Sequence, residues 1–133
     1  MDDELEPVSR TREIQLLFGL VALLWLIEIV DSVFFDDALQ AQGIRPRSLS
    51  GFDGILWAPF LHGTFGHLIS NTIPFVVTGG LVMIRGVRPW AAVTLFITVV
   101  GGLLVWILAR NHVHIGISIV IFGYLGYLLV VGF

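Results

Sequence analysis

The sequence predicts an all-α membrane protein that folds as a polytopic helix bundle. Hydrophobic residues make up 56% of the 133 residues and charged residues only 13%, whereas a soluble domain usually carries about 25% charged residues. The apolar residues gather in long segments, and a helix needs roughly 20 such residues to cross the ~30 Å hydrocarbon core of a bilayer. We therefore expect four transmembrane helices, at about 14–35, 61–84, 90–108 and 115–133.

The composition also excludes several classes of protein. The net charge of −3 does not favour a nucleic-acid partner. The chain has no cysteine, which excludes disulfides, thiolate zinc sites and a cysteine nucleophile. Residues 1–13 are polar and too acidic for a signal peptide. They predict a cytoplasmic N-terminal tail in front of a membrane domain over 14–133.

The segments between the spans contain residues that break helices. The connection 36–61 holds several glycines and prolines, which predict an extramembrane loop without a long helix, and Trp57 in this loop favours the membrane interface. Pro89 suits the first turn of the third span. Glu28 and Asp31 lie near the far end of the first span. There they would reach the headgroup region, bond to neighbouring helices, or form a buried proton path.

Alternation of the spans divides the arginines between the two ends of the bundle. One end would hold four and the other three: Arg10, Arg12, Arg85 and Arg88 against Arg45, Arg47 and Arg110. The end with more arginines is expected in the cytoplasm, together with the N-terminus. This topology places His67, Asn71 and Ser118 near the outer face of the membrane.

Three polar side chains cluster at the head of the second span: His62, His67 and Asn71. Polar groups are expensive in lipid, so a cluster of them indicates a function or a specific contact. His67 and Asn71 are four residues apart and share one face of a helix. Hydrogen bonding between helices is the common structural use of such residues.

A second unusual stretch begins the fourth span, where Gly116-Ile117-Ser118 precedes Phe122, Gly123 and Gly126. Gly116 permits a close substrate approach or a sharp entry into the helix. Gly123 and Gly126 would let a neighbouring helix pack closely. A serine in a helix often forms a hydrogen bond with its own helix backbone. If the two stretches form one site, the Ser118 hydroxyl would instead face the hydrogen-bond donors of the second span.

Together the two stretches resemble the rhomboid intramembrane serine proteases. The shared pattern is His-x4-His-x3-Asn at the head of the second span and Gly-x-Ser-x3-Phe-Gly-x2-Gly in the fourth. Two loop motifs, Gly-x-Arg-Pro-Arg at 43–47 and Pro-Phe-x-His at 59–62, are similar to those of bacterial members. The resemblance covers about 14–133 and implies a multi-pass protein of the bacterial cell membrane.

The resemblance also implies an activity and a role for each motif residue. Rhomboids are endopeptidases that cleave transmembrane segments of membrane proteins through a Ser–His dyad, without a metal or another cofactor. Ser118 matches the nucleophile, His67 and Asn71 match the residues that stabilise the oxyanion, and His62 would support the site. The implied partners are transmembrane protein substrates and the lipid bilayer, with no nucleic acid.

The sequence departs from the family pattern in two ways. The family often has glycine directly after the serine, where this chain has Ile119. The general base of the family is a histidine in a sixth span, and this chain has no histidine after Ser118. A serine hydroxyl without an adjacent base is a weak nucleophile. We therefore expect either a chain truncated before its last two spans, or an inactive relative that binds transmembrane segments.

A third interpretation uses the histidines as metal ligands, because imidazole suits zinc or copper. The four candidates are His62, His67, His112 and His114. The spacing of five residues between the first two is poor for a shared metal on one helix. The loop position of the last two also makes them poor candidates for the missing base. The prediction is therefore a site without a metal.

Overall fold

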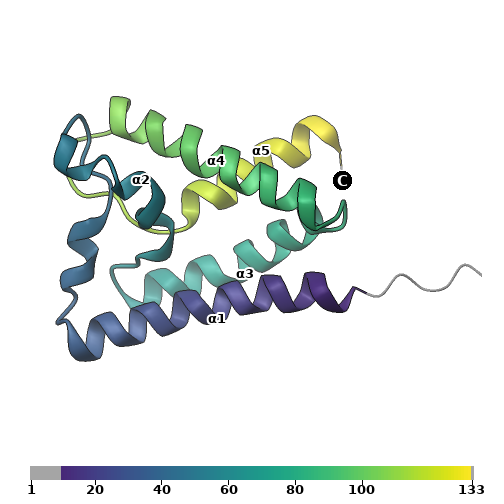
Figure 1. Ribbon diagram of the computed structural model, residues 1–133, viewed down its shortest axis with the longest axis horizontal. Coiled ribbons are helices and arrows are strands. Elements are labelled where there is room, and N and C mark those ends of the chain that lie inside the picture. Colours follow the sequence, from purple (N-terminus) through teal and green to yellow (C-terminus); the bar gives the residue numbers. More distant parts are fainter. Residues whose placement is uncertain (1–9, 133) are drawn as a thin grey trace, which may run out of the picture.

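The computed structural model describes residues 10–132. The regular elements of the described chain are helices, which are joined by loops (Figure 1). Four helices are long: α1 (Thr11–Phe34), α3 (Phe65–Met83), α4 (Val87–Leu108) and α5 (Ser118–Val131). Four are short: η1 (Ala38–Gln42), η2 (Leu49–Gly51), α2 (Gly54–Trp57) and η3 (Ala58–Phe60). The predicted all-α bundle is confirmed, and the connection 36–61 contains only short helices, as expected.

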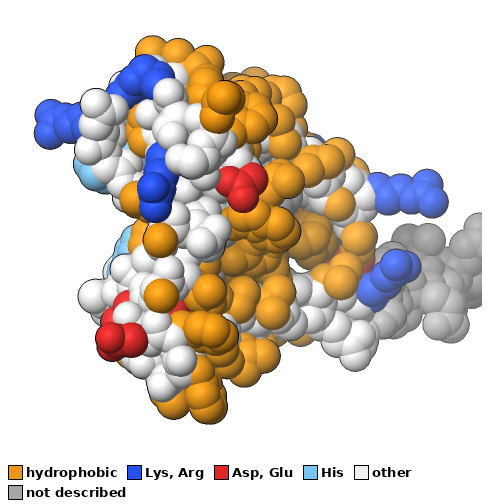
Figure 2. All heavy atoms as spheres, turned by 60° about the vertical axis from the view of Figure 1, so that its left-hand side comes forward, with side chains coloured by type: hydrophobic (Ala, Val, Ile, Leu, Met, Phe, Trp, Pro, Cys, Tyr) orange, Lys and Arg blue, Asp and Glu red, His pale blue; other side chains and the backbone are white. Residues whose placement is uncertain are grey.

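Helices α1, α3 and α4 are long and apolar enough to cross a membrane. Helix α5 is apolar but has only 14 residues, which is about 21 Å at 1.5 Å per residue, so it is shorter than the predicted fourth span. Figure 2 shows hydrophobic side chains over the helical part of the visible surface and most charged side chains near the ends of the molecule. This distribution suits a chain that spans a bilayer.

Two helices begin later than the sequence predicted, and each has a local cause. Helix α3 begins at Phe65 because Thr64 caps it, with the Thr64 hydroxyl accepting the N–H of His67 at 3.0 Å. His62 therefore precedes the helix and does not form its first turn. Helix α5 begins at Ser118 because Gly116 has a φ of +106°, which a helix does not accommodate.

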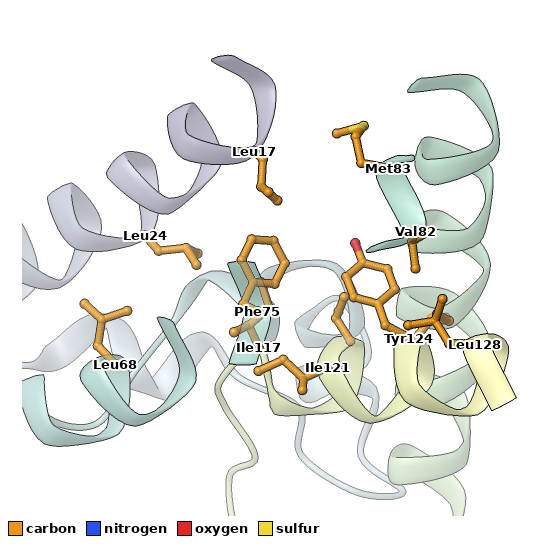
Figure 3. Packing of buried hydrophobic residues seen from close by; sticks show 12 residues of the cluster. Leu17, Leu24, Leu68, Phe75, Val82, Met83, Ile117, Ile121, Tyr124 and Leu128 are labelled. Carbon is orange, nitrogen blue, oxygen red and sulfur yellow. The ribbon is translucent and has the colours of Figure 1, made fainter. Parts of the chain in front are cut away.

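Helix α3 is the centre of the bundle and contacts α1, α4 and α5. The core lies between these helices, with Phe75 of α3 and Tyr124 of α5 both fully buried (Figure 3). The Tyr124 hydroxyl lies 2.6 Å from the hydroxyl of Thr94 on α4, so the polar end of this buried ring has a partner. This packing holds the first turns of α3 and α5 at the same end of the bundle.

Glycines allow several of the close contacts around this core. A Cβ at Gly79 would lie 3.1 Å from Leu17 of α1, and a Cβ at Gly101 would lie 2.7 Å from Ile119 of α5. A Cβ at Gly123 would lie only 2.3 Å from Ile97 of α4. Substituting these glycines would push the helices apart.

We call the end of the bundle formed by residues 35–64 and 109–117 the loop face; it lies on the left of Figure 1. Its two segments are joined by an antiparallel bridge, in which Ile44 and His114 exchange backbone hydrogen bonds of 2.9 Å. A Cβ at Gly43 would lie 2.6 Å from the carbonyl oxygen of His114. The two segments are therefore packed backbone to backbone, which fixes the approach of residues 115–117 to α3.

The acidic residues near the end of α1 are both buried. The side-chain carboxylate of Asp31 accepts a hydrogen bond from the N–H of Leu39 at 2.9 Å. The backbone carbonyl of Asp31 accepts hydrogen bonds from the N–H groups of Phe35 and Asp37. Asp31 thus fastens the first turns of the loop that follows α1, which agrees with the structural interpretation of this residue. Glu28 lies one turn earlier on α1 and is 3% exposed.

The arginines are grouped at the two ends as the alternation of spans predicts. Arg10 donates to the carbonyl of Ile84 at 3.0 Å, and Arg85 donates to the carbonyl of Gly132 at 2.8 Å. These contacts place the start of α1, the end of α3 and the end of α5 together, opposite the loop face.

Candidate catalytic site between α3 and α5

His62 holds the chain just before the serine. The N–H of Ile117 donates to Nε2 of His62 at 3.4 Å, and the imidazole is 1% exposed. Because Nε2 accepts, the proton of the neutral ring is on Nδ1. His62, for which the sequence predicts a supporting role near the site, thus contacts the Gly116-Ile117-Ser118 segment through the N–H of Ile117.

His67 and Asn71 lie directly against Gly116. A Cβ at this glycine would lie 2.7 Å from Cε1 of His67 and 3.6 Å from Nδ2 of Asn71. The N–H of Gly116 donates to the carbonyl of Ala58 at 2.8 Å. Of the two purposes that its sequence position suggested, the structure shows the sharp helix entry, and Gly116 also packs closely on the two polar residues of α3. The close substrate approach stays a prediction.

Two buried nitrogens of this site have no hydrogen-bond partner among residues 10–132, Nδ1 of His62 and Nδ2 of Asn71. An unsatisfied buried polar group costs about 1–3 kcal/mol, and such groups are few in native proteins. Both are donors when Nε2 of His62 accepts the N–H of Ile117, and the nitrogen of Asn71 lies against Gly116. The arrangement suits a hydrogen-bond acceptor, such as a carbonyl oxygen or a water molecule.

Ser118 is the first residue of α5 and is half-buried. It lies two residues after Gly116 in the sequence, and its hydroxyl has no hydrogen bond to any described residue. The back-bonding that often satisfies a helical serine is therefore not seen at this position. The N-terminal end of a helix carries orphan N–H groups and a partial positive charge, which favour negative charge developing near Ser118.

The other predicted residues of α5 lie away from this contact. Phe122 is 72% exposed, and Gly123 packs against Ile97 of α4. A Cβ at Gly126 would meet nothing within 4 Å among the described residues, and the contact of Gly126 with a helix that presents the base stays a prediction. Ala58, whose carbonyl receives the Gly116 N–H, was not predicted. The only sequence signal near it was the Pro59-Phe60 lead-in to His62.

The loop histidines form a separate pair. The rings of His112 and His114 have centroids 4.0 Å apart, and Nε2 of His114 lies 2.9 Å from the carbonyl of Arg110. The rings of His62 and His67 form a second, edge-on pair at 5.0 Å. Within residues 10–132 no three or more metal-ligating side chains are grouped to hold an ion, so the metal-binding interpretation gains no support.

The electrostatic environment keeps His62 neutral. Burial and, to a smaller extent, the nearby His67 lower the pKa of His62 from 6.5 to about 4. A neutral imidazole is required for Nε2 to accept the N–H of Ile117. The lowered pKa therefore maintains the contact that holds the chain before Ser118.

We expect the protein to lose stability in mild acid because of His62. Between pH 6.5 and about 4, His62 binds a proton in the unfolded chain but not in the folded chain. Above pH 6.5 this effect does not reduce the free energy of unfolding, and below pH 6.5 the free energy of unfolding decreases as the pH falls. The total loss is at most about 3 kcal/mol, at 1.36 kcal/mol per pKa unit. Unfolding in mixed micelles between pH 7.5 and 4.5 measures this slope.

His62→Gln keeps an acceptor for Ile117 without a titrating ring, so we expect a smaller slope with pH in this variant. Thr72→Val, which changes no titrating group, is the matched control, with an expected slope equal to that of the unmodified protein. Equal slopes in the unmodified protein and the His62 variant would contradict this assignment.

Comparison with known proteins agrees with the geometry of the site. The family model described as Rhomboid domain matches residues 51–133. Proteins of Mycobacterium tuberculosis and Mycobacterium bovis are each 39% identical to this chain over 118 residues, covering 84% of it and 49% of their own length. A Mycobacterium leprae protein is 36% identical over 118 residues, covering 84% of this chain and 47% of its own length.

The chain thus spans about half the length of these curated relatives, all of which are described as uncharacterised proteins. No solved structure matches it. The three apolar helices and the matched domain make the protein an integral membrane protein. Because the matched domain includes α3, α4 and α5 and covers more than half of the chain, the protein belongs to the rhomboid family.

Proposed function

We propose that the protein is an intramembrane serine endopeptidase that cleaves transmembrane segments of membrane proteins. One observation carries this proposal: the nitrogen of the buried Asn71 amide has no partner within the described part of the chain and, with His67, faces the glycine two residues before Ser118. A structural polar contact would satisfy this donor. An oxyanion site leaves it free for the substrate.

In the proposed reaction the Ser118 hydroxyl oxygen attacks the carbonyl carbon of the scissile peptide and gives its proton to a base. Negative charge then develops on the carbonyl oxygen, and the side chains of His67 and Asn71, with the N–H of Ser118, donate hydrogen bonds to it. The C–N bond then breaks as the base returns this proton to the leaving amine, and water hydrolyses the acyl-enzyme and regenerates the serine. His62 does not touch the substrate; it positions Ile117, and through it Ser118.

The proton of the Ser118 hydroxyl needs a base. This chain has no histidine after Ser118, and the two loop histidines are engaged with each other and with backbone carbonyls. The curated relatives extend beyond the part that this chain matches. We infer that the base is a histidine in the corresponding further part of the intact polypeptide. The activity is therefore proposed for the intact polypeptide that carries this sequence.

The proposal includes a location and a class of substrate. The larger arginine group, around Arg10 and Arg85, faces the cytoplasm, which places the loop face and Ser118 at the outer surface of a bacterial cell membrane. Water from this surface reaches the half-buried serine for hydrolysis. The substrate is a single-pass membrane protein whose helix unwinds readily near the outer interface.

A serine-directed probe tests the proposal without knowledge of the substrate. We expect a fluorophosphonate to form an adduct on the peptide that contains Ser118, because the activated hydroxyl displaces fluoride from phosphorus. Mass spectrometry of the labelled intact protein locates the adduct. Ser118→Ala should abolish it, whereas Ser70→Ala, which removes an exposed hydroxyl one turn after His67, should retain it.

The missing base favours one alternative, a rhomboid-like protein that binds transmembrane segments without cleaving them. The same experiment separates the two functions. If no adduct forms while a fluorescent transmembrane peptide still binds the intact protein, the binding function is correct and the peptidase proposal is wrong.

A further inference from the structure

The two arginines of the Arg45-Pro46-Arg47 sequence make different contacts. Arg47 binds the end of α4: its guanidinium donates to the carbonyl of Ile107 at 2.9 Å and to the side chain of Asn111, and its N–H donates to the carbonyl of Trp106 at 2.8 Å. Such contacts satisfy the last carbonyls of a helix. Arg47 is therefore a structural residue.

Arg45 makes only one hydrogen bond with its side chain, to the carbonyl of Ala41 at 3.4 Å. Its guanidinium carries five N–H donors, and no carboxylate pairs with it within the described residues. The side chain is exposed. Arg45 therefore retains unused donors in a loop that is otherwise bonded tightly to the end of α4.

A cavity of about 300 Å³ opens beside Arg45 on the loop face, and its other lining residues are Pro46, Asn111, His112 and Val113. The oxygen of the Asn111 amide accepts from Arg47, so its nitrogen is left as a donor. The ring of His112 packs on His114, which limits its motion. Nδ1 of His112 donates to the carbonyl of Val113 at 3.2 Å, so this ring is already engaged. The cavity is thus lined by two side chains with unused hydrogen-bond donors, the permanently charged Arg45 and Asn111, and by no acidic side chain.

We propose that this cavity binds the phosphate group of an anionic membrane lipid. Phosphate oxygens accept several hydrogen bonds at once, and arginine recognises them with paired donors. The backbone bridge between Ile44 and His114 joins the segments that carry the donors, so the cavity exists before the ligand arrives.

Apolar residues favour a lipid over a free phosphate ion: Pro46 and Val113 line the cavity itself, and further apolar side chains flank Gly51 in the sequence. Gly51 packs on Arg45, with a Cβ at Gly51 only 2.2 Å from Cβ of Arg45. Its neighbours Leu49 and Phe52 are 88% and 47% exposed. The cavity is at the lower limit of ligand pockets, which run from about 300 to 1,000 Å³. It accommodates a headgroup, while the acyl chains would lie outside on these apolar residues.

Other charges on the loop face do not cancel this site. Asp36 and Asp37 follow α1 at the opposite edge, and Asp53 lies beside the apolar surface of α2 and α4. Figure 2 shows arginine side chains in the upper part of this face, and acidic side chains at its lower edge and near its middle. The proposal concerns a different surface from the α3–α5 contact and does not depend on peptidase activity.

Native mass spectrometry of the purified intact protein, titrated with phosphatidylglycerol, tests the proposal. We expect Arg45→Gln to weaken binding of the first lipid about fivefold, the effect of losing a charge-assisted contact at a partly exposed site. Arg45→Lys keeps the charge without the paired donors and should weaken binding less. Arg88→Gln, the same charge change at the other end of α4, should alter it less than about twofold.

Asn111→Asp is a second test: it keeps the oxygen that accepts from Arg47, replaces the amide nitrogen with an oxygen, and should also weaken the binding of phosphatidylglycerol. Equal losses in the Arg45 and Arg88 glutamine variants would show a general charge effect and overturn the proposal. So would equal binding of phosphatidylcholine, which carries no net charge. Binding of inorganic phosphate without binding of the lipid would assign the cavity to a free anion and overturn it as well.

Discussion

Cleavage of a reporter transmembrane substrate is expected to fall to background when Ser118 is replaced by alanine in the intact protein. Removing the nucleophile of a serine hydrolase lowers turnover by about 10⁴-fold or more, and the small remainder comes from binding and the oxyanion site. The change removes the attacking oxygen, so no acyl-enzyme can form. Fluorescence of a reporter with a helix-destabilised transmembrane segment measures the loss.

The structure makes this variant a clean test, because the Ser118 hydroxyl has no hydrogen bond to a described residue. Its removal should therefore leave the free energy of unfolding within about 0.5 kcal/mol of the unmodified value. Ser70→Ala is the matched control: the Ser70 hydroxyl donates to the carbonyl of His67 at 2.8 Å, and its loss should leave cleavage nearly unchanged. Retained cleavage in the Ser118 variant would show that another residue is the nucleophile.

The pairing of two distant helices was predicted from the resemblance of their motifs to the rhomboid pattern, whereas the arrangement within each helix had local signals. His67 and Asn71 share a face through the helical repeat, whatever surrounds them. A glycine two residues before Ser118 indicated an irregular start for the last helix. The later start of α3 also had a signal, because Thr64 is a preferred cap residue.

The contacts that complete the site had no such signal. The carbonyl of Ala58 meets the N–H of Gly116, and Nε2 of His62 meets the N–H of Ile117. Both contacts depend on the path of a loop that two short helices and a backbone bridge determine. A backbone carbonyl is present at every residue, so no residue type distinguishes the one that is used.

Burial in a membrane protein is similarly hard to read from residue type. Phe75 is fully buried in the core, whereas Phe122 is 72% exposed, although both lie in apolar helices. Lipid and protein core are equally apolar, so a phenylalanine is acceptable in either place. The same reasoning applies to Gly123 and Gly126, of which only the first has a neighbour within 4 Å.

Replacement of Asn71 by alanine is expected to lower kcat about 10²–10³-fold, which corresponds to about 2.7–4 kcal/mol of transition-state stabilisation. The KM should change little, because the amide nitrogen strengthens its hydrogen bond only as negative charge develops on the substrate oxygen. Initial rates over a range of reporter concentrations, in detergent or in vesicles, separate the two constants. A change confined to KM would rule out the oxyanion role.

Stability provides an independent readout of the same variant. Nδ2 of Asn71 is buried and has no partner among the described residues, so the alanine variant breaks no hydrogen bond of this nitrogen with them. Thr72→Val is the matched control on the same helix, because the Thr72 hydroxyl accepts from the indole of Trp25 at 3.1 Å. We expect the Thr72 variant to lose stability and to keep its kcat. We expect the Asn71 variant to lose kcat and to keep its stability, because the Asn71 nitrogen would form its hydrogen bond with the substrate and not with the rest of the fold. The reverse pattern would assign Asn71 to packing between α3 and α5.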